Sequence, residues 1–261
     1  MLGACSPVIR WEKHAMDGHR TGVISVVGSD VVTALGSVED SIYHAPNGAE
    51  FVGGCTPAVA SLMLGVQPDM AYLKEVIGYS PREMTKYRPE SELSNWAADV
   101  IRLGVERILG VKVDLAITNF GGIRTDMPEG DILIDTIVSM FPFNNRLCYV
   151  RLAGSDVRAI FNQFAVDGKF EAVSGVNAVA EGGKITSLEI GDEPLDDNRD
   201  YILATIDFLL DGGDGLSLAK NAKELVLSKV KVNEWIVAYV RSLAAEGKYV
   251  EGSIDGRVTV R

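Results

Sequence analysis

The clearest hydrophobic pattern of the chain lies within residues 91–110, where apolar side chains recur at spacings of three and four positions. This spacing predicts an amphipathic helix with one buried face. Ser91 is the expected N-cap and Gly110 the expected stop. The same kind of spacing predicts a helix that begins at Gly154 and another over residues 232–243.

Short apolar runs predict strands at residues 113–118, 147–152, 185–190, 201–206 and 258–260. Residues 132–140 predict a short strand that runs into a short helix and ends at the sequence F-P-F, since proline disfavours helix at the residue before it. β-branched composition predicts strands at 23–27 and 31–35, and residues 71–77 fit a short helix or a strand. From about residue 90 the helices and strands interleave irregularly, which favours an α+β fold with a mixed sheet and packed helices.

Length and charge narrow the choices of class. The 261 residues suggest one large domain or two small ones, and we expect a domain at 81–261 with an N-terminal extension, residues 1–80, packed on it. A net charge of −11 argues against a nucleic-acid or anionic-membrane surface. A small anionic ligand remains compatible, because one arginine and a few amides can form a local positive site.

The first residues, M-L-G-A-C-S, resemble the end of a bacterial lipoprotein signal. This motif predicts a lipid anchor at Cys5 and a place in the cell envelope, periplasmic or at the outer membrane. Because the motif is short, a chance match is the alternative.

Histidine is scarce, and this restricts the chemistry. The chain has only His14, His19 and His44, with no H-x-x-x-H or H-E-x-x-H spacing. A hydrolytic metal pair usually draws on several histidines and aspartates at strand ends. We therefore expect no metal site, no cofactor and no catalytic residue in this chain.

Residues 119–124 read N-F-G-G-I-R and follow a predicted buried strand. Two adjacent glycines allow a sharp turn that brings backbone amides close to a ligand. Arg124 can fork onto a phosphate or a carboxylate. An ordinary turn is the alternative interpretation.

Two phenylalanines and one aspartate stand beside loop signals. Phe143 follows a proline and precedes two asparagines, and Phe208 precedes the loop D-G-G-D-G. Two ring faces about 7 Å apart could hold a flat base, with about 1–3 kcal/mol for each stack. Asp214 could accept hydrogen bonds from two ribose hydroxyls. Core packing of the phenylalanines and a turn-shaping role for Asp214 are the alternatives.

These same segments resemble the C-terminal domain of the 5′-nucleotidase family. Residues 119–124 resemble its N-G-G-G-I-R motif, 141–145 (F-P-F-N-N) its P-F-G-N motif, and 207–215 (D-F-L-L-D-G-G-D-G) its F-L-A-x-G-G-D-G motif. The likeness spans roughly residues 85–245. Phe120, Pro89 and Leu216 depart from the family pattern, which has glycine, arginine and an aromatic residue at these places.

The resemblance implies an α+β domain that binds a nucleotide and presents it to a metal-bearing domain. By match, Asn119 and Arg124 contact the phosphate end, Phe143 and Phe208 enclose the base, and Asp214 takes the ribose hydroxyls. The full set of substrate-binding residues that we expect is Asn119, Gly121, Gly122, Arg124, Phe143, Asn145, Phe208 and Asp214.

Of the metallophosphatase motifs of the family, N-H-[DE] and G-H-x-H do not occur in this sequence, and D-x-H occurs only as Asp17-Gly18-His19 near the N-terminus. We therefore expect the nucleotide-binding half of a 5′-nucleotidase-type phosphohydrolase, which acts in nucleotide catabolism with a separate metallophosphatase chain as partner. The alternatives are a nucleoside- or nucleotide-binding lipoprotein without a hydrolase partner, and an interaction module that has kept the fold but lost the site.

Overall fold

The computed structural model describes residues 19–26 and 30–261. The chain forms two compact units, Met1–Lys74 and Glu75–Arg261. The expected packing of residues 1–80 on the rest of the chain stays a prediction. No described helix is both long and apolar enough to cross a membrane.

The first unit is built on a small antiparallel sheet in the order β1-β2-β3. Tyr43 of β2 is buried, and its hydroxyl donates to the carbonyl of Leu35 at 2.7 Å. The elements are α1 (Val31–Leu35), β1 (Ser37–Glu39), β2 (Ile42–His44), β3 (Glu50–Val52), α2 (Thr56–Gly65), α3 (Gln67–Met70) and the 3₁₀ turn η1 (Ala71–Lys74).

The strand predicted at residues 31–35 is wrong. These residues form α1, because the Asp30 side chain accepts from the Thr33 amide at 3.1 Å and caps a helical turn. Residues 23–26 form no strand either. Residues 71–77, left open between helix and strand, contain both η1 and the start of strand β4 (Val76–Ser80).

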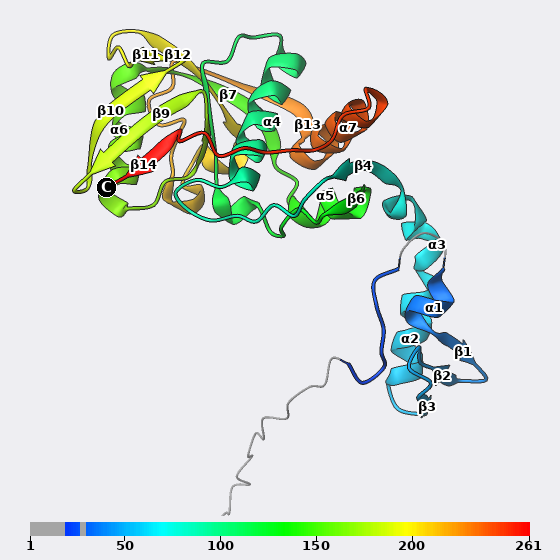
Figure 1. The fold of residues 1–261 in the computed structure, drawn as a ribbon. Helices are drawn as coiled ribbons and strands as arrows, with labels where there is room; N and C mark the ends of the chain where they lie inside the picture. Colours follow the sequence, from blue (N-terminus) through cyan, green and yellow to red (C-terminus); the bar gives the residue numbers. More distant parts are fainter. Residues whose placement is uncertain (1–18, 27–29) are drawn as a thin grey trace, which may run out of the picture. The chain divides into compact units, whose positions relative to one another are not determined.

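The second unit is organised around a five-stranded mixed sheet in the order β13-β7-β12-β5-β8 (Figure 1). Strand β12 is parallel to β5 and antiparallel to β7, while β8 and β13 form the edges. Thr205 of β12 donates to the carbonyl of Ile117 at 2.8 Å. The strands are β5 (Leu115–Thr118), β7 (Arg146–Ala153), β8 (Ala172–Ser174), β12 (Asp200–Ile206) and β13 (Glu224–Lys231).

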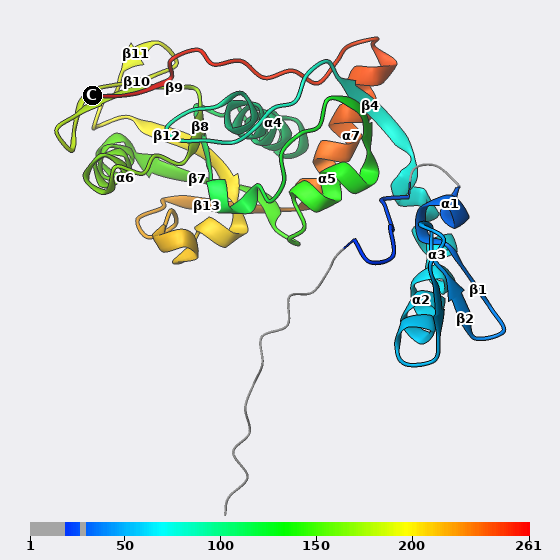
Figure 2. The ribbon, with the colours of Figure 1, turned by 60° about the horizontal axis from the view of Figure 1, so that its bottom comes forward.

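A second sheet in the order β11-β10-β9-β14 lies beside the first, and a two-stranded ribbon pairs β4 with β6 (Figures 1 and 2). Strand β14 is parallel to β9, and the other pairs are antiparallel. These strands are β4 (Val76–Ser80), β6 (Gly130–Leu133), β9 (Val176–Glu181), β10 (Lys184–Ile190), β11 (Glu193–Pro194) and β14 (Val258–Val260).

Helix α4 (Glu92–Leu109) packs on the central sheet, against β8, β5, β12 and β7. Its ends are those predicted: Ser91 and Ser94 form a capping box, and Gly110 ends the helix at φ 65°. Helix α6 (Gly154–Asp167) packs on β10, β9 and β7, and α7 (Val232–Ala245) contacts α4, α5 (Ile134–Met140), β4 and β13. The predicted α+β fold is confirmed.

Sequence reasoning missed β8, β9 and β13. Gly175, at φ 72°, divides the first two into segments too short to show a pattern. Strand β13 lies at a sheet edge and leaves Leu225 and Leu227 about half exposed. Its apolar residues therefore do not report a buried face.

A buried carboxylate fastens the C-terminal segment to α4. Glu90 is only 6% exposed and accepts from the Asn95 side chain at 2.8 Å. It also accepts from the amides of Asp255, Gly256 and Val258. Asn95 donates in addition to the carbonyl of Ser253 at 2.8 Å. Glu90 and Asn95 therefore hold the segment that leads into β14.

We expect Glu90→Gln to lower the free energy of unfolding by about 1–3 kcal/mol, because an amide replaces carboxylate oxygens that accept from four N–H groups. Urea denaturation followed by tryptophan fluorescence measures this loss, and hydrogen exchange at Val258 shows whether β14 loosens. The exposed Glu181→Gln is the control. Equal stability of the two variants would contradict this account of Glu90.

Candidate ligand-binding site

The parallel pairing of β5 with β12 brings the three sequence motifs to one edge of the sheet. Parallel strands end at the same edge, so residues 119–124 after β5 and residues 207–215 after β12 emerge together. Strand β7 is antiparallel to β12, with Leu147 opposite Ile206, so the segment that precedes β7 reaches the same edge. The amide of Arg146 donates to Asp207 at 3.0 Å and joins two of these loops.

The turn after β5 is built around the side chain of Asn119. Asn119 is 3% exposed, and its amide nitrogen donates to Asp214 Oδ2 at 2.6 Å, across 95 residues of chain. Its Oδ1 is buried without a hydrogen-bond partner within the described residues. Asn119 therefore faces inward and sets the position of the aspartate.

Gly121 and Gly122 are needed for space. A Cβ on Gly121 would lie 2.8 Å from Asp214 Oδ2, and one on Gly122 would lie 2.6 Å from Asn119 Oδ1. Neither glycine has a positive φ. The turn, η2 (Phe120–Gly122), therefore requires glycine because the Asn119–Asp214 pair approaches its backbone so closely.

Phe120, at the place of a family glycine, directs its ring into the core. It is 4% exposed and clusters with Ala98 and Ala172. The Arg88 guanidinium lies 4.4 Å from the ring centroid, and the Phe120 amide donates to Glu171 at 2.6 Å. The phenylalanine thus adds to the packing under the turn, while Gly121 and Arg124 are exposed.

Three cations surround this turn. Arg124 is exposed, donates to the Gly121 carbonyl at 3.3 Å and forms no ion pair within the described part of the chain. Arg88 donates to Glu171 and to the carbonyl of Phe170. Lys86 donates through Nζ to the carbonyls of Phe120 and Ile123.

Sequence reasoning missed Lys86. Its contacts reach 34 and 37 residues along the chain, and it lies between β4 and α4 in a segment without periodicity. Burial lowers the pKa of Lys86, and the neighbouring Arg124 and Arg88 lower it further, while Asp126 opposes them.

The two phenylalanines are surface residues. Phe143 is 46% exposed and Phe208 is 45% exposed, so neither is a core side chain. Phe208 lies in η3 (Asp207–Leu209), and its backbone is packed so closely on η4 (Gly213–Gly215) that a Cβ on Gly213 would meet its carbonyl at 2.0 Å. Half-exposed rings on constrained loops are suited to stacking with a ligand.

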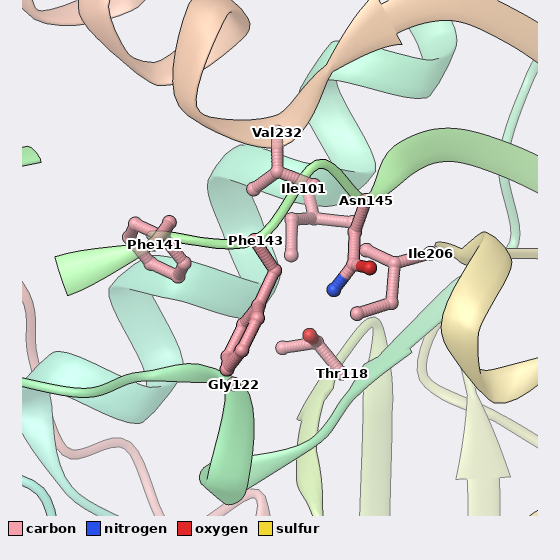
Figure 3. Close-up of a pocket in the computed structure, with 8 residues that line it drawn as sticks. All are labelled: Ile101, Thr118, Gly122, Phe141, Phe143, Asn145, Ile206 and Val232. Carbon is pink, nitrogen blue, oxygen red and sulfur yellow. The ribbon is translucent and has the colours of Figure 1, made fainter. Parts of the chain in front are cut away.

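Phe143 and Asn145 face a shared pocket with Gly122 and Thr118 (Figure 3). The Asn145 side chain points toward Thr118 and Ile206, and the Phe143 ring lies beside Gly122. The Arg124 guanidinium is 5.9 Å from the Phe143 ring centroid, which links the turn to the pocket. Ile101, Phe141, Ile206 and Val232 complete the lining.

Asp214 occupies a strained loop position. Its φ is 49°, and it lies between Gly212 at φ 88° and Gly215 at φ 80°. Left-handed backbone is unfavourable for residues with a Cβ, and aspartate is among those that tolerate it. The loop and the Asn119 hydrogen bond together fix the carboxylate.

The structure thus joins all of the predicted site residues except Phe208 through a chain of contacts. Asn119, Gly121 and Asp214 meet at the turn; Gly122, Phe143 and Asn145 line the pocket; Arg124 touches both groups. Enclosure of a base between Phe143 and Phe208 stays a prediction. Among residues 19–26 and 30–261, no three histidine, cysteine, aspartate or glutamate side chains cluster in a way that could hold a metal ion.

A family model describes the same part of the chain. The model of the 5′-nucleotidase C-terminal domain matches residues 70–221, more than half of the sequence. The chain belongs to this family. All three motifs at the sheet edge fall within the match.

Curated relatives and solved structures agree with this assignment. The chain is 32% identical to protein UshA of Yersinia enterocolitica over 128 residues, and 30% identical to cell wall protein Lmo0130 of Listeria monocytogenes over 184 residues. These alignments cover 48% and 64% of this chain but only 23% of each relative. The chain therefore spans about a quarter of the length of the curated relatives that it matches.

The 5′-nucleotidase precursor of Thermus thermophilus superposes with a TM-score of 0.67 and 28% identity, over 83% of this chain and 45% of that one. The NAD nucleotidase of Haemophilus influenzae, at 17% identity and a TM-score of 0.60 over 84% of this chain and 48% of its own, shows the shared fold.

We expect Asn119→Asp to destabilise the domain by about 1–3 kcal/mol at neutral pH, because a carboxylate replaces the donor that faces Asp214. Urea denaturation at neutral pH measures this loss.

The double variant Asn119→Asp with Asp214→Asn exchanges donor and acceptor and should recover the stability. Asn177→Asp, at an exposed asparagine–aspartate pair joined at 3.3 Å, is the matched control and should change little. Failure of the exchange to restore stability would contradict a structural role for this hydrogen bond.

Proposed function

We propose that the unit Glu75–Arg261 binds a nucleoside phosphate and presents it for hydrolysis by a metallophosphatase partner chain. The observation that carries this proposal is the meeting of three motifs at the sheet edge formed by the ends of β5 and β12. One loop offers a cation beside a Gly-Gly turn, and the two others offer half-exposed aromatic rings.

Each part of the site suits one part of a nucleotide. Arg124 pairs with no carboxylate in the described part of the chain and can fork onto phosphate oxygens. Phe143 and Phe208 offer ring faces for a base, with Asn145 in the adjoining pocket. Asp214, held by Asn119, offers carboxylate oxygen to ribose hydroxyls. This chain would supply binding energy and orientation, while a partner would supply metal-activated water.

The names of the relatives support the substrate class and a role in nucleotide catabolism. The solved Thermus thermophilus relative is a 5′-nucleotidase precursor, and a Haemophilus influenzae protein 33% identical over 124 residues is an NAD 5′-nucleotidase. We transfer from them the class of ligand, a nucleotide or nucleoside.

We also propose that the chain is a lipoprotein of the bacterial cell envelope, anchored at Cys5. The support is the sequence M-L-G-A-C-S and the name of one relative, a cell wall protein. Cys5 lies outside the described residues. Radiolabelled palmitate incorporated into the wild-type chain but not into Cys5→Ala tests this anchor.

Calorimetry with AMP, adenosine and UDP-glucose tests the binding proposal. We expect Phe143→Ala and Phe208→Ala each to weaken AMP and adenosine alike, by about 1–3 kcal/mol, because each removes one stacking face. Arg124→Ala should weaken AMP and leave adenosine unchanged, because only AMP carries the phosphate.

Tyr249→Ala, at another exposed aromatic residue, and Arg241→Ala, at another exposed arginine, are the matched controls. No binding of any of the three ligands would favour an interaction module without a working site. Unchanged affinity in both phenylalanine variants would contradict the proposed place of the base.

We expect the 261-residue chain to bind AMP without hydrolysing it, since its three histidines show no metal-ligand spacing. Phosphate release from AMP with added Mn²⁺ or Zn²⁺ measures this, with a metallophosphatase of the family as positive control. Sustained turnover by the purified chain would overturn the need for a partner, whereas tight binding with no gain from any metallophosphatase would favour a pure binding lipoprotein.

A further inference from the structure

Lys86 is hydrogen-bonded to backbone carbonyls of the Gly-Gly turn. Its ammonium donates to the carbonyls of Phe120 and Ile123, the first and last residues of the bend. Its own backbone amide donates to Asp126 at 3.2 Å, which fixes the base of the side chain. The side chain is only partly exposed, so these contacts are shielded from full solvation.

The charges at this turn are unevenly compensated. Arg88 is paired with Glu171, which also accepts from the Phe120 amide. Arg124 contacts a backbone carbonyl and the Phe143 ring but no carboxylate within the described residues. Lys86 faces Arg124, Asp126 and Arg88. Three cations therefore meet three carboxylates, Glu171, Asp126 and Asp214, at this turn, and Arg124 pairs with none of these carboxylates within the described residues.

We infer that Lys86 is a positioning residue that makes the site selective for phosphorylated ligands; this inference rests on the proposed function. By binding the two carbonyls, the lysine fixes the orientation of the turn that carries Gly121 and Arg124. Its positive charge, held behind the turn, adds to that of Arg124. A phosphate monoester carries nearly two negative charges at neutral pH and gains most from this arrangement, whereas an unphosphorylated nucleoside gains nothing from the charge.

The charge half of this role is not available to a neutral side chain, and the two hydrogen bonds are not available to an apolar one. An ammonium has three N–H donors and no acceptor, so it can satisfy both carbonyls and remain charged. An arginine at residue 86 would keep the charge and several donors. A methionine would keep the length and the apolar stem but lose both, and the two carbonyls would lose their donor.

The test is the ratio of AMP affinity to adenosine affinity, measured by calorimetry for the wild type, Lys86→Met and Lys86→Arg. We expect Lys86→Met to weaken AMP by about tenfold or more and adenosine by less than about twofold, which corresponds to the loss of one charge-assisted interaction. Lys86→Arg should retain most of the ratio. Lys184→Met, at an exposed lysine of β10, is the matched control.

A pH series on the wild type provides a readout that needs no apolar variant. Because burial and the neighbouring arginines lower the pKa of Lys86, its charge is lost at a lower pH than that of an ordinary lysine. The preference for AMP should therefore fall as the pH rises toward about 10.4, the ordinary lysine value. In Lys86→Arg this fall should be absent, because arginine stays protonated there.

The outcomes separate the inference from the proposed function. If the wild type binds AMP no better than adenosine, the proposal that the site binds a phosphate group is wrong. A wild type that prefers AMP, with the same preference in Lys86→Met, would overturn the role of Lys86 alone. Equal weakening of AMP and adenosine in Lys86→Met would show a purely structural role and would also overturn it. Should Lys86→Met fail to fold, the pH series on the wild type and Lys86→Arg decides in the same way.

Discussion

The pairing of β5 with β12 is the constraint on which the rest of the site depends. These strands are adjacent and parallel, although about 85 residues separate them in sequence, so their carboxyl ends leave the sheet side by side. Loops at such an edge can cooperate because rigid strands hold their starting points. The Asn119–Asp214 hydrogen bond then ties the two loops together directly. Without the parallel register, the turn and the Gly-rich loop would have no common surface.

The residues of this edge fall into an inner and an outer set. Asn119, Glu171 and Lys86 bind backbone or other side chains, and they hold the turn in one shape. Arg124, Phe143 and Phe208 are the side chains left facing solvent. A binding site needs both sets, because exposed groups bind with geometric precision only when their own backbone is fixed. The glycines at 121 and 122 belong to the inner set through the space that they leave.

The departure from the family pattern at Phe120 is accommodated by this arrangement. The bulky Phe120 occupies a core position between Ala98 and Ala172, under the Arg88 guanidinium. Its contribution to the turn is made through its backbone, whose amide binds Glu171 and whose carbonyl binds Lys86. The groups exposed to a ligand belong to the neighbouring residues. A change of the side chain at 120 therefore alters the packing below the turn.

The sequence by itself determined the helices and several strands of the second unit and the identity of the family. The spacing of Leu93, Trp96, Val100 and Ile101 predicted α4, because helical burial repeats every three or four residues. The caps at Ser91 and Gly110 follow from side-chain hydrogen bonding and left-handed backbone, which are also local. The motifs at 119–124, 141–145 and 207–215 are contiguous, so a single sequence displays them. Only the tertiary structure decided that Asn119 turns inward to Asp214, that Phe120 is buried and that Lys86 joins the turn. Each of these contacts links residues far apart in the chain or depends on which face of a strand end is covered, and such long-range packing leaves no local periodicity to read.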